Sequence, residues 1–183
     1  HVYIHNNEYV VGMSTLLGKL ASPMLENWKI SQQVNAIKTE MEREGIPIDQ
    51  IQKIVTNAKS NAKKSGDNIL NIGSMVHKFC EMWLKGEKFT DPSDPVILSC
   101  FEKFKRFWTK HNLKVIESEK VLYSERGFCG TLDLIAKDSQ DNLWLIDIKT
   151  SKGLFLNMVH QLHGYKLAYE EQTGKKINKM YIV

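Results

Sequence analysis

Cysteine is scarce in this chain of 183 residues, and long apolar runs are absent. The three cysteines, Cys80, Cys100 and Cys129, are widely spaced and form no Cys-x-x-Cys pair. This excludes a disulfide framework and a four-cysteine metal or cluster site supplied by this chain alone. No uncharged apolar stretch reaches the roughly 18 residues that a membrane-spanning helix needs. We therefore expect a cytoplasmic protein in a reducing compartment, with no membrane partner.

The composition is that of a folded globular chain. Hydrophobic residues make up 42% and charged residues 25% of the sequence, which excludes an intrinsically disordered segment. The length corresponds to about one domain. The 25 basic residues exceed the 21 acidic ones, for a net charge of +4. This slight excess favours anionic partners but does not identify one.

Helical periodicity dominates the first two thirds of the chain. Helices are predicted at 14–28 with a break at Pro23, at 30–44, at 47–64 with an end at Gly66, at 67–86, and over a segment that ends at Lys110. In the last of these, Phe101, Phe104 and Trp108 recur among basic residues, a spacing that favours a buried stripe over base stacking. Residues 1–66 are expected to form a helical region packed on a core of residues 67–183, in one compact domain.

From Lys114 the apolar pattern changes to a period of two, which is typical of strands. Strands are predicted at 115–124, 129–137 and 143–150, and a helix at 154–171 and a strand at 177–183 follow. The predicted fold class is therefore α/β, with a core made of a helix, a three-strand antiparallel meander, a helix and a strand.

Charged residues interrupt the most apolar predicted strand. Asp147 and Lys149 share one side of it, either as a structural ion pair or as part of a site. If the preceding turn is centred on Gln140, Asp133 lies opposite Asp147, at a separation where two carboxylates repel unless a cation lies between them. Oxygen ligands favour Mg²⁺ or Mn²⁺ in such a place. Gly130 would let a ligand or another backbone approach closely.

Five short motifs follow one another in a recognisable order. They are Gly73-Ser74-Met75-Val76-His77, Glu119, Gly130-Thr131-Leu132-Asp133, Asp147-Ile148-Lys149-Thr150, and Gln161 with Tyr165. In order and spacing they resemble the PD-(D/E)XK nuclease superfamily, and most of all its RecB-type, or phage-type, exonuclease branch. The resemblance covers residues 67–183 and implies a restriction-endonuclease-like core. Leu132 stands where the superfamily name has proline, and the second carboxylate is Asp147 rather than glutamate.

The resemblance implies roles for individual residues. Mg²⁺ or Mn²⁺ would be bound by His77, Asp133, Asp147 and the backbone carbonyl of Ile148. Catalytic roles would fall to Asp133, Asp147, Lys149, Gln161 and Tyr165, with Lys149 positioning or activating the attacking water. Tyr165 fits a place in the core equally well. Glu119 is a possible additional acid, preferred over Glu117, and Glu81 is a possible hydrogen-bond acceptor for His77.

The implied activity is hydrolysis of phosphodiester bonds in DNA to 5′-phosphate and 3′-hydroxyl ends, by an exonuclease of DNA recombination, DNA repair or phage DNA metabolism. The substrate would be single- or double-stranded DNA read with weak sequence preference. Further partners compatible with this activity are a helicase, an annealing protein or other copies of the chain. Two alternatives remain open: a catalytically weak nucleic-acid-binding module of a larger recombination or repair complex, and an unrelated interaction domain whose charges are structural.

Overall fold

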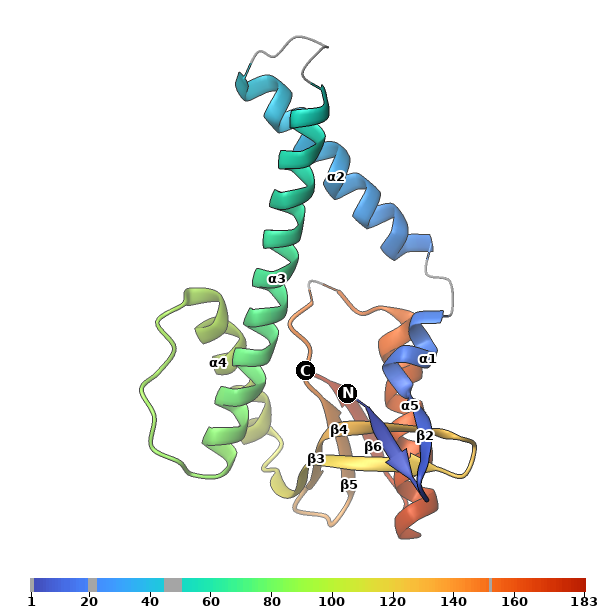
Figure 1. The fold of residues 1–183 in the computed structure, drawn as a ribbon. Coiled ribbons are helices and arrows are strands. Elements are labelled where there is room, and N and C mark those ends of the chain that lie inside the picture. Colours follow the sequence, from blue (N-terminus) through green and yellow to red (C-terminus); the bar gives the residue numbers. More distant parts are fainter. Residues whose placement is uncertain (1, 20–22, 45–50, 152) are drawn as a thin grey trace. The chain divides into compact units, whose positions relative to one another are not determined.

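A computed structural model describes residues 2–19, 23–44, 51–151 and 153–183 of the chain (Figure 1). It divides into two compact units. One comprises His1–Leu20 together with Gly73–Val183, and the other comprises Ala21–Ile72. The first unit holds the sheet and all the residues of the motifs above. The predicted packing of residues 1–66 on the core stays a prediction.

Two long helices occupy the region where four shorter ones were expected. Helix α2 spans Pro23–Glu44 and helix α3 spans Ile51–Leu84. Pro23 begins α2, as a proline in the first helical turn can. The expected end of a helix at Gly66 is wrong, because α3 continues through this glycine. Glycine in a helix interior costs only about 1 kcal/mol, and it stops a helix when it adopts a left-handed conformation. Gly86, with φ of +68°, adopts that conformation two residues after α3. The expected start at Pro47 lies outside the described residues.

The three-strand meander is present, followed by a helix and a parallel strand. Strands β3 (Lys114–Ser124), β4 (Phe128–Lys137) and β5 (Leu143–Asp147) pair antiparallel in that order. Helix α5 (Leu156–Thr173) then leads to β6 (Lys179–Ile182), which pairs parallel with β5. The chain therefore has a mixed α/β fold with a multi-stranded sheet. Strand β5 is shorter than predicted because the amide of Ile148 donates to the Asp133 side chain rather than to a neighbouring strand.

An N-terminal hairpin replaces part of the expected helical region. Strand β1 (Tyr3–His5) pairs antiparallel with β2 (Glu8–Gly12), and β2 joins β4 in parallel through Val11 and Phe128. Asn6 and Asn7 both have positive φ, the conformation of a two-residue hairpin turn. Helix α1 (Met13–Lys19) follows directly. Asn-Asn between two short apolar segments is the signal that predicts this hairpin, and only the helical part of the region was predicted.

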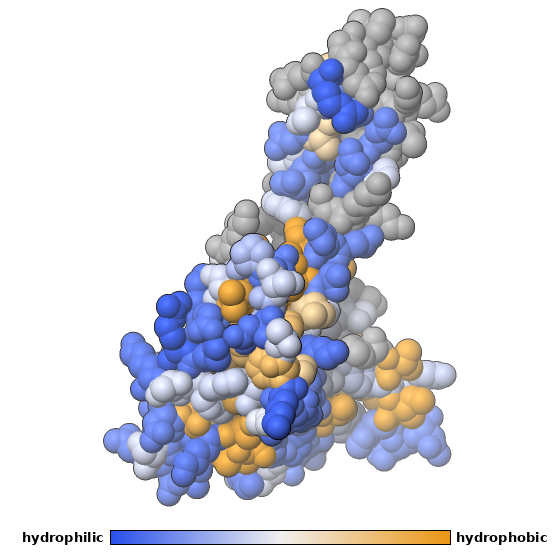
Figure 2. All heavy atoms as spheres, turned by 90° about the vertical axis from the view of Figure 1, so that its left-hand side faces the viewer, coloured by the Kyte–Doolittle hydropathy of each residue, from blue (hydrophilic) through white to orange (hydrophobic). Residues whose placement is uncertain are grey.

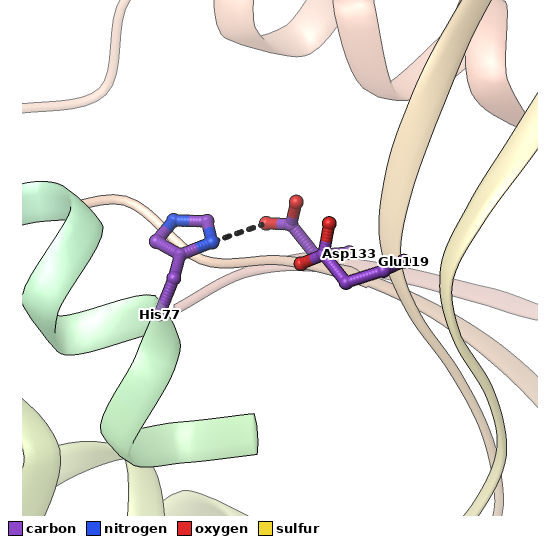
Figure 3. Close-up of side chains that lie close together, drawn as sticks. All are labelled: His77, Glu119 and Asp133. Atoms are coloured by element: carbon purple, nitrogen blue, oxygen red, sulfur yellow. Dashed lines mark ion pairs between the residues drawn. The ribbon is translucent and has the colours of Figure 1, made fainter. Parts of the chain in front are cut away.

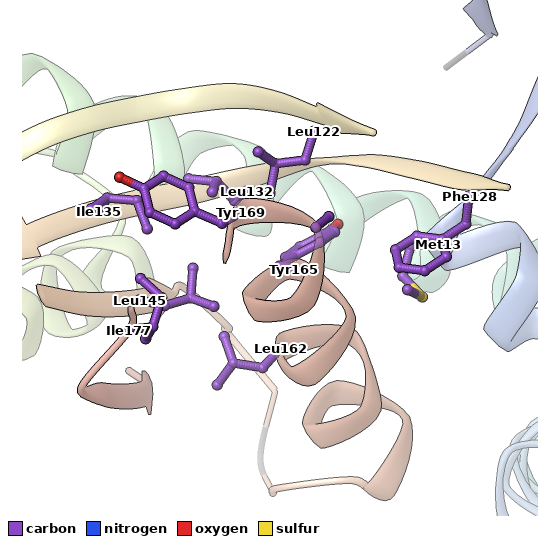
Figure 4. Close-up of a cluster of buried hydrophobic side chains, with 11 residues drawn as sticks. Met13, Leu122, Phe128, Leu132, Ile135, Leu145, Leu162, Tyr165, Tyr169 and Ile177 are labelled. Carbon is purple, nitrogen blue, oxygen red and sulfur yellow. The ribbon is translucent and has the colours of Figure 1, made fainter. Parts of the chain in front are cut away.

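The core of the sheet unit lies between α5 and the strands β3, β4 and β5 (Figure 4). Its most deeply buried members are Leu122, Leu132, Ile135, Leu145 and Tyr169, each 0% exposed. Helix α4 (Pro95–Lys110) buries Phe101, Phe104 and Trp108, which confirms that this aromatic stripe packs inside the protein. Asp94 caps α4 by accepting hydrogen bonds from the amides of Val96 and Ile97.

The described surface carries hydrophobic side chains in small groups among hydrophilic ones on the face that Figure 2 shows. Isolated apolar residues of this kind are ordinary on proteins. Within the described residues, no helix is both long and apolar enough to cross a membrane.

Candidate metal centre

The register between β4 and β5 puts two aspartates opposite each other. The paired residues run from Lys137 with Leu143 to Leu134 with Ile146. The next position in the same register joins Asp133 to Asp147, as predicted from a turn centred on Gln140. The turn itself is built around Asp138, whose side chain accepts hydrogen bonds from the amides of Gln140 and Asn142. The polar residues of the turn thus fix which side chains meet at the far end of the two strands.

Three side chains from three different elements converge at this point (Figure 3). His77 comes from α3, Glu119 from β3 and Asp133 from β4, and one ligand atom of each lies within 4.8 Å of the others. The His77 Nδ1 atom is 3.7 Å from Asp133 Oδ2. Among the described residues, this is the group of histidine and carboxylate side chains that could hold a metal ion. They line a small pocket together with Glu81, Leu84, Ser118, Leu134 and Ile148.

The backbone of Ile148 holds two of these side chains in place. Its carbonyl accepts a hydrogen bond of 2.8 Å from His77 Nε2, and its amide donates one of 2.7 Å to Asp133 Oδ2. With the proton on Nε2, the Nδ1 atom of His77 presents its lone pair toward Asp133. A backbone acceptor on the far nitrogen is the usual way that proteins orient a metal-binding histidine. Ile148 therefore lies beside His77 and Asp133, while its predicted role as a metal ligand stays a prediction.

Glu119 reaches the cluster through an irregular backbone. Its neighbours Ser118 and Lys120 pair with Leu134 and Leu132, so Glu119 lies across from Asp133. Its φ of +48° is rare for a residue with a side chain and costs free energy of about 1–3 kcal/mol, as found at functional sites. The alternative acid, Glu117, instead accepts a 3.0 Å hydrogen bond from the Tyr169 hydroxyl.

Asp147, which is buried, and Lys149, which is half-buried, form an ion pair beside the cluster. Lys149 Nζ is 2.7 Å from Asp147 Oδ2, and the aspartate residue is 1% exposed. The expectation that the two charges meet is confirmed, and among the described residues no hydrogen-bond donor reaches Asp147 Oδ1. Asp147 stays outside the three-residue cluster.

The carboxyl groups of the site resist ionisation. Burial raises the pKa of Asp133, and the negative charge of Asp147 raises it further against the opposing effect of His77. Burial raises the pKa of Asp147 too, while Lys149 opposes the shift. For Glu119, burial and then the charge of Asp133 raise the pKa. A bound cation would relieve both causes, because it offsets the mutual repulsion and the loss of water.

Tyr165 occupies a place in the core, whereas the catalytic roles of Tyr165 and Gln161 stay predictions. The ring is 4% exposed and packs in the core, while its hydroxyl accepts a 2.8 Å hydrogen bond from Gln161 Nε2. It lies so close to Gly130 that an added Cβ there would be 2.6 Å from Tyr165 Cε1. Burial raises the pKa of Tyr165, the Gln161 hydrogen bond opposes this, and the charges of Asp147 and Asp133 add to it. Tyr165 therefore lies within electrostatic reach of the site.

Glu81 lines the same pocket but pairs with Lys85, whose Nζ is 2.6 Å from Glu81 Oε1. The expected hydrogen bond between Glu81 and His77 is not among those of the described residues, because the two His77 nitrogens face Ile148 and Asp133. Sequence reasoning also missed Tyr3, whose hydroxyl is 3.3 Å from the Thr131 hydroxyl, two residues from Asp133.

No known protein-family model matches this sequence, and no curated protein matches it. Among solved structures, one similar chain is described as a repair endonuclease from Pyrococcus abyssi. The similarity has a TM-score of 0.33 and 16% sequence identity, and it covers 52% of this chain and 39% of that chain. At this TM-score a common fold is not established, so the side chains of the site carry the functional argument.

Proposed function

We propose that this chain is a metal-dependent nuclease that hydrolyses phosphodiester bonds in DNA as an exonuclease. The observation that carries the proposal is the convergence of His77, Glu119 and Asp133 beside the Asp147–Lys149 ion pair. His77, Glu119 and Asp133 are far apart in sequence and come from different elements. A structural ion pair does not need a second and a third acid beside it, whereas a cation site uses several.

The donor set fits a hard divalent cation. One imidazole nitrogen and carboxylate oxygens suit Mg²⁺ or Mn²⁺. Burial raises the pKa values of the three acids, and a bound cation would offset that effect. His77 through Nδ1, Asp133 and Glu119 are the side chains that would hold it, with Asp147 adjacent. A bound divalent cation would neutralise charge on the phosphate and make water a better nucleophile.

The chain's own residues supply orientation and charge. The Ile148 carbonyl and amide hold His77 and Asp133 in position, which makes Ile148 an orienting group rather than a ligand in this proposal. Lys149, whose side chain is 25% exposed, keeps an ammonium group at the edge of the site where a phosphate oxygen would arrive. Its contact with Asp147 fixes the position of that ammonium before substrate binds.

The proposed site would contact the backbone of DNA. A bound divalent cation and one lysine interact with phosphate groups, which carry no sequence information. We therefore expect weak sequence preference, and products with 5′-phosphate and 3′-hydroxyl ends. The second candidate, a binding module without turnover, is favoured by the ion pair of Lys149, because that lysine already has a partner.

A cleavage assay separates the two. End-labelled linear and circular DNA, single- and double-stranded, is incubated with Mg²⁺, Mn²⁺ or EDTA. The wild type should degrade linear DNA only with metal, and Asp133→Asn should abolish this. The matched control is Asp141→Asn, the same chemical change at an exposed turn residue with φ of +65°, where asparagine is well tolerated. Binding without cleavage under every metal would favour the binding module, and equal cleavage by both variants would refute the site.

A further inference from the structure

Beyond Glu119 and Asp133, further side chains of β3 and β4 lie on the same face of the sheet. In the antiparallel register of β3 and β4, Val121 pairs with Thr131 and Tyr123 pairs with Cys129. Paired residues project to one side, and every second residue shares it. Gly130, Leu122 and Leu132 face α5, since they contact Tyr165 or belong to its core. The two pairs therefore lie on the opposite face, in line with Glu119 and Asp133.

The N-terminal hairpin brings aromatic side chains onto this face. The Tyr3 hydroxyl is 3.3 Å from Thr131 Oγ1. The His5 ring stacks on Tyr123, with ring centroids 3.6 Å apart and an angle of 12° between the planes. Both contacts join β1 to strands that are distant in sequence, β4 and β3. Tyr3, His5 and Tyr123 are half-buried, so parts of their rings remain accessible.

These rings line a pocket that the proposed mechanism does not use. Ile4 and Val121 also line it, and Val121 is 60% exposed. The lining further includes Leu122, Cys129 and, from α5, Gln172, so the pocket extends beyond the face that holds the two pairs. Among the described residues that line it, none is Lys, Arg, Asp or Glu. A pocket without such charges is unsuited to a phosphate. Flat rings, an aliphatic wall and one amide that both donates and accepts suit a flat heterocycle with polar edges.

We infer that this pocket binds an unpaired nucleobase of the nucleic acid whose backbone reaches the metal cluster. The inference rests on the proposed function and deepens it, because it assigns a single-stranded segment to the substrate. Cys129 and Asp133 are four positions apart on β4, about 13 Å along a strand, so one nucleic-acid strand can reach both the pocket and the metal-binding residues. A base within a duplex has both faces stacked on its neighbours, and only an unpaired base can offer a face to these rings.

The test measures binding in EDTA, which prevents metal-dependent cleavage. Fluorescence anisotropy compares a short single-stranded oligonucleotide of mixed sequence with an abasic deoxyribose-phosphate chain of equal length. The wild type should bind the natural strand about tenfold more tightly, since aromatic stacking on one base is worth that much. His5→Ala should remove most of this difference, and His5→Phe, which keeps a ring, should retain it. Thermal unfolding of both variants shows whether the hairpin stays folded.

Tyr9→Ala is the matched control. Tyr9 pairs with Ile4 in the same hairpin and is 83% exposed, but it does not line the pocket. The Tyr9→Ala variant should keep the preference for the natural over the abasic strand within about twofold of the wild-type value, a change well below the tenfold stacking effect. Equal binding of natural and abasic strands by the wild type would overturn the inference, as would an equal loss in Tyr9→Ala and His5→Ala. If DNA is still cleaved in those cases, the proposed function stands alone; failure to bind either strand, with no cleavage, would contradict both.

Discussion

Gly130 is the position where the smallest change should have a large and calculable effect. A Cβ at this residue would lie 2.6 Å from Cε1 of Tyr165 and 3.3 Å from Cζ, distances at which one of the two groups must move. The ring is 4% exposed and its hydroxyl is bonded to Gln161, so it has little room to turn. Overpacking of a core costs about 1–3 kcal/mol. In a chain of this length that corresponds to a fall in Tm of about 2–12 °C for Gly130→Ala.

Urea and thermal unfolding followed by circular dichroism measure this cost. Gly18→Ala is the control, because Gly18 is exposed in α1 and an added Cβ there meets nothing within 4 Å. It should be neutral or stabilising by up to about 1 kcal/mol, since alanine favours helix more than glycine does. Replacing Tyr165 by leucine should make Gly130→Ala less costly than in the wild type. An unchanged Tm for Gly130→Ala would refute the proposed contact of Tyr165 with the strand.

Three further predictions concern charge and burial. Burial and the charge of Asp147 raise the pKa of Asp133, so the free energy of unfolding of the metal-free protein should fall as the pH rises through that elevated pKa. Asp133→Asn should make this pH dependence weaker, and an equal pH dependence in the variant would contradict the prediction. The hydrogen bond from Ser124 lowers the pKa of Glu171, so the contribution of Glu171 to stability should be present above about pH 4.3 and lost as the pH falls further. In Glu171→Gln, urea unfolding should therefore show a smaller loss of stability at acid pH. Phe101→Ala, at a residue 0% exposed, should lower the free energy of unfolding by about 3–5 kcal/mol, and a loss below 1 kcal/mol would mean that α4 is not part of the core.

The register of the site was predictable because its cause is local. Asp138, Gln140 and Asn142 are polar turn residues in sequence, and the hydrogen bonds that they form fix the pairing of β4 with β5. Once that pairing is set, Asp133 and Asp147 must meet. The strands and α5 were predictable for the same reason, since period-two and helical patterns arise within short stretches.

Other features depend on contacts that a linear pattern does not reveal. The irregularity of β3 between Val115 and Glu117, and the left-handed Glu119, have no sequence marker, although they decide which glutamate joins His77 and Asp133. The continuation of α3 through Gly66 shows that a weak local preference yields to a long run of helical hydrogen bonds. The hydrogen bonds from Ile148 to His77 and Asp133 exist only once α3, β4 and β5 are assembled.

Binding of Mn²⁺ to the metal-free protein, measured by isothermal titration calorimetry, shows whether the three side chains hold a metal ion. We expect a saturable site in the wild type and in Asp141→Asn, with affinity lost in Asp133→Asn and reduced in His77→Ala. The loss should appear while all three variants remain folded by circular dichroism. Binding of equal strength in the wild type and Asp133→Asn, or no binding by the wild type, would contradict a metal centre at His77, Glu119 and Asp133.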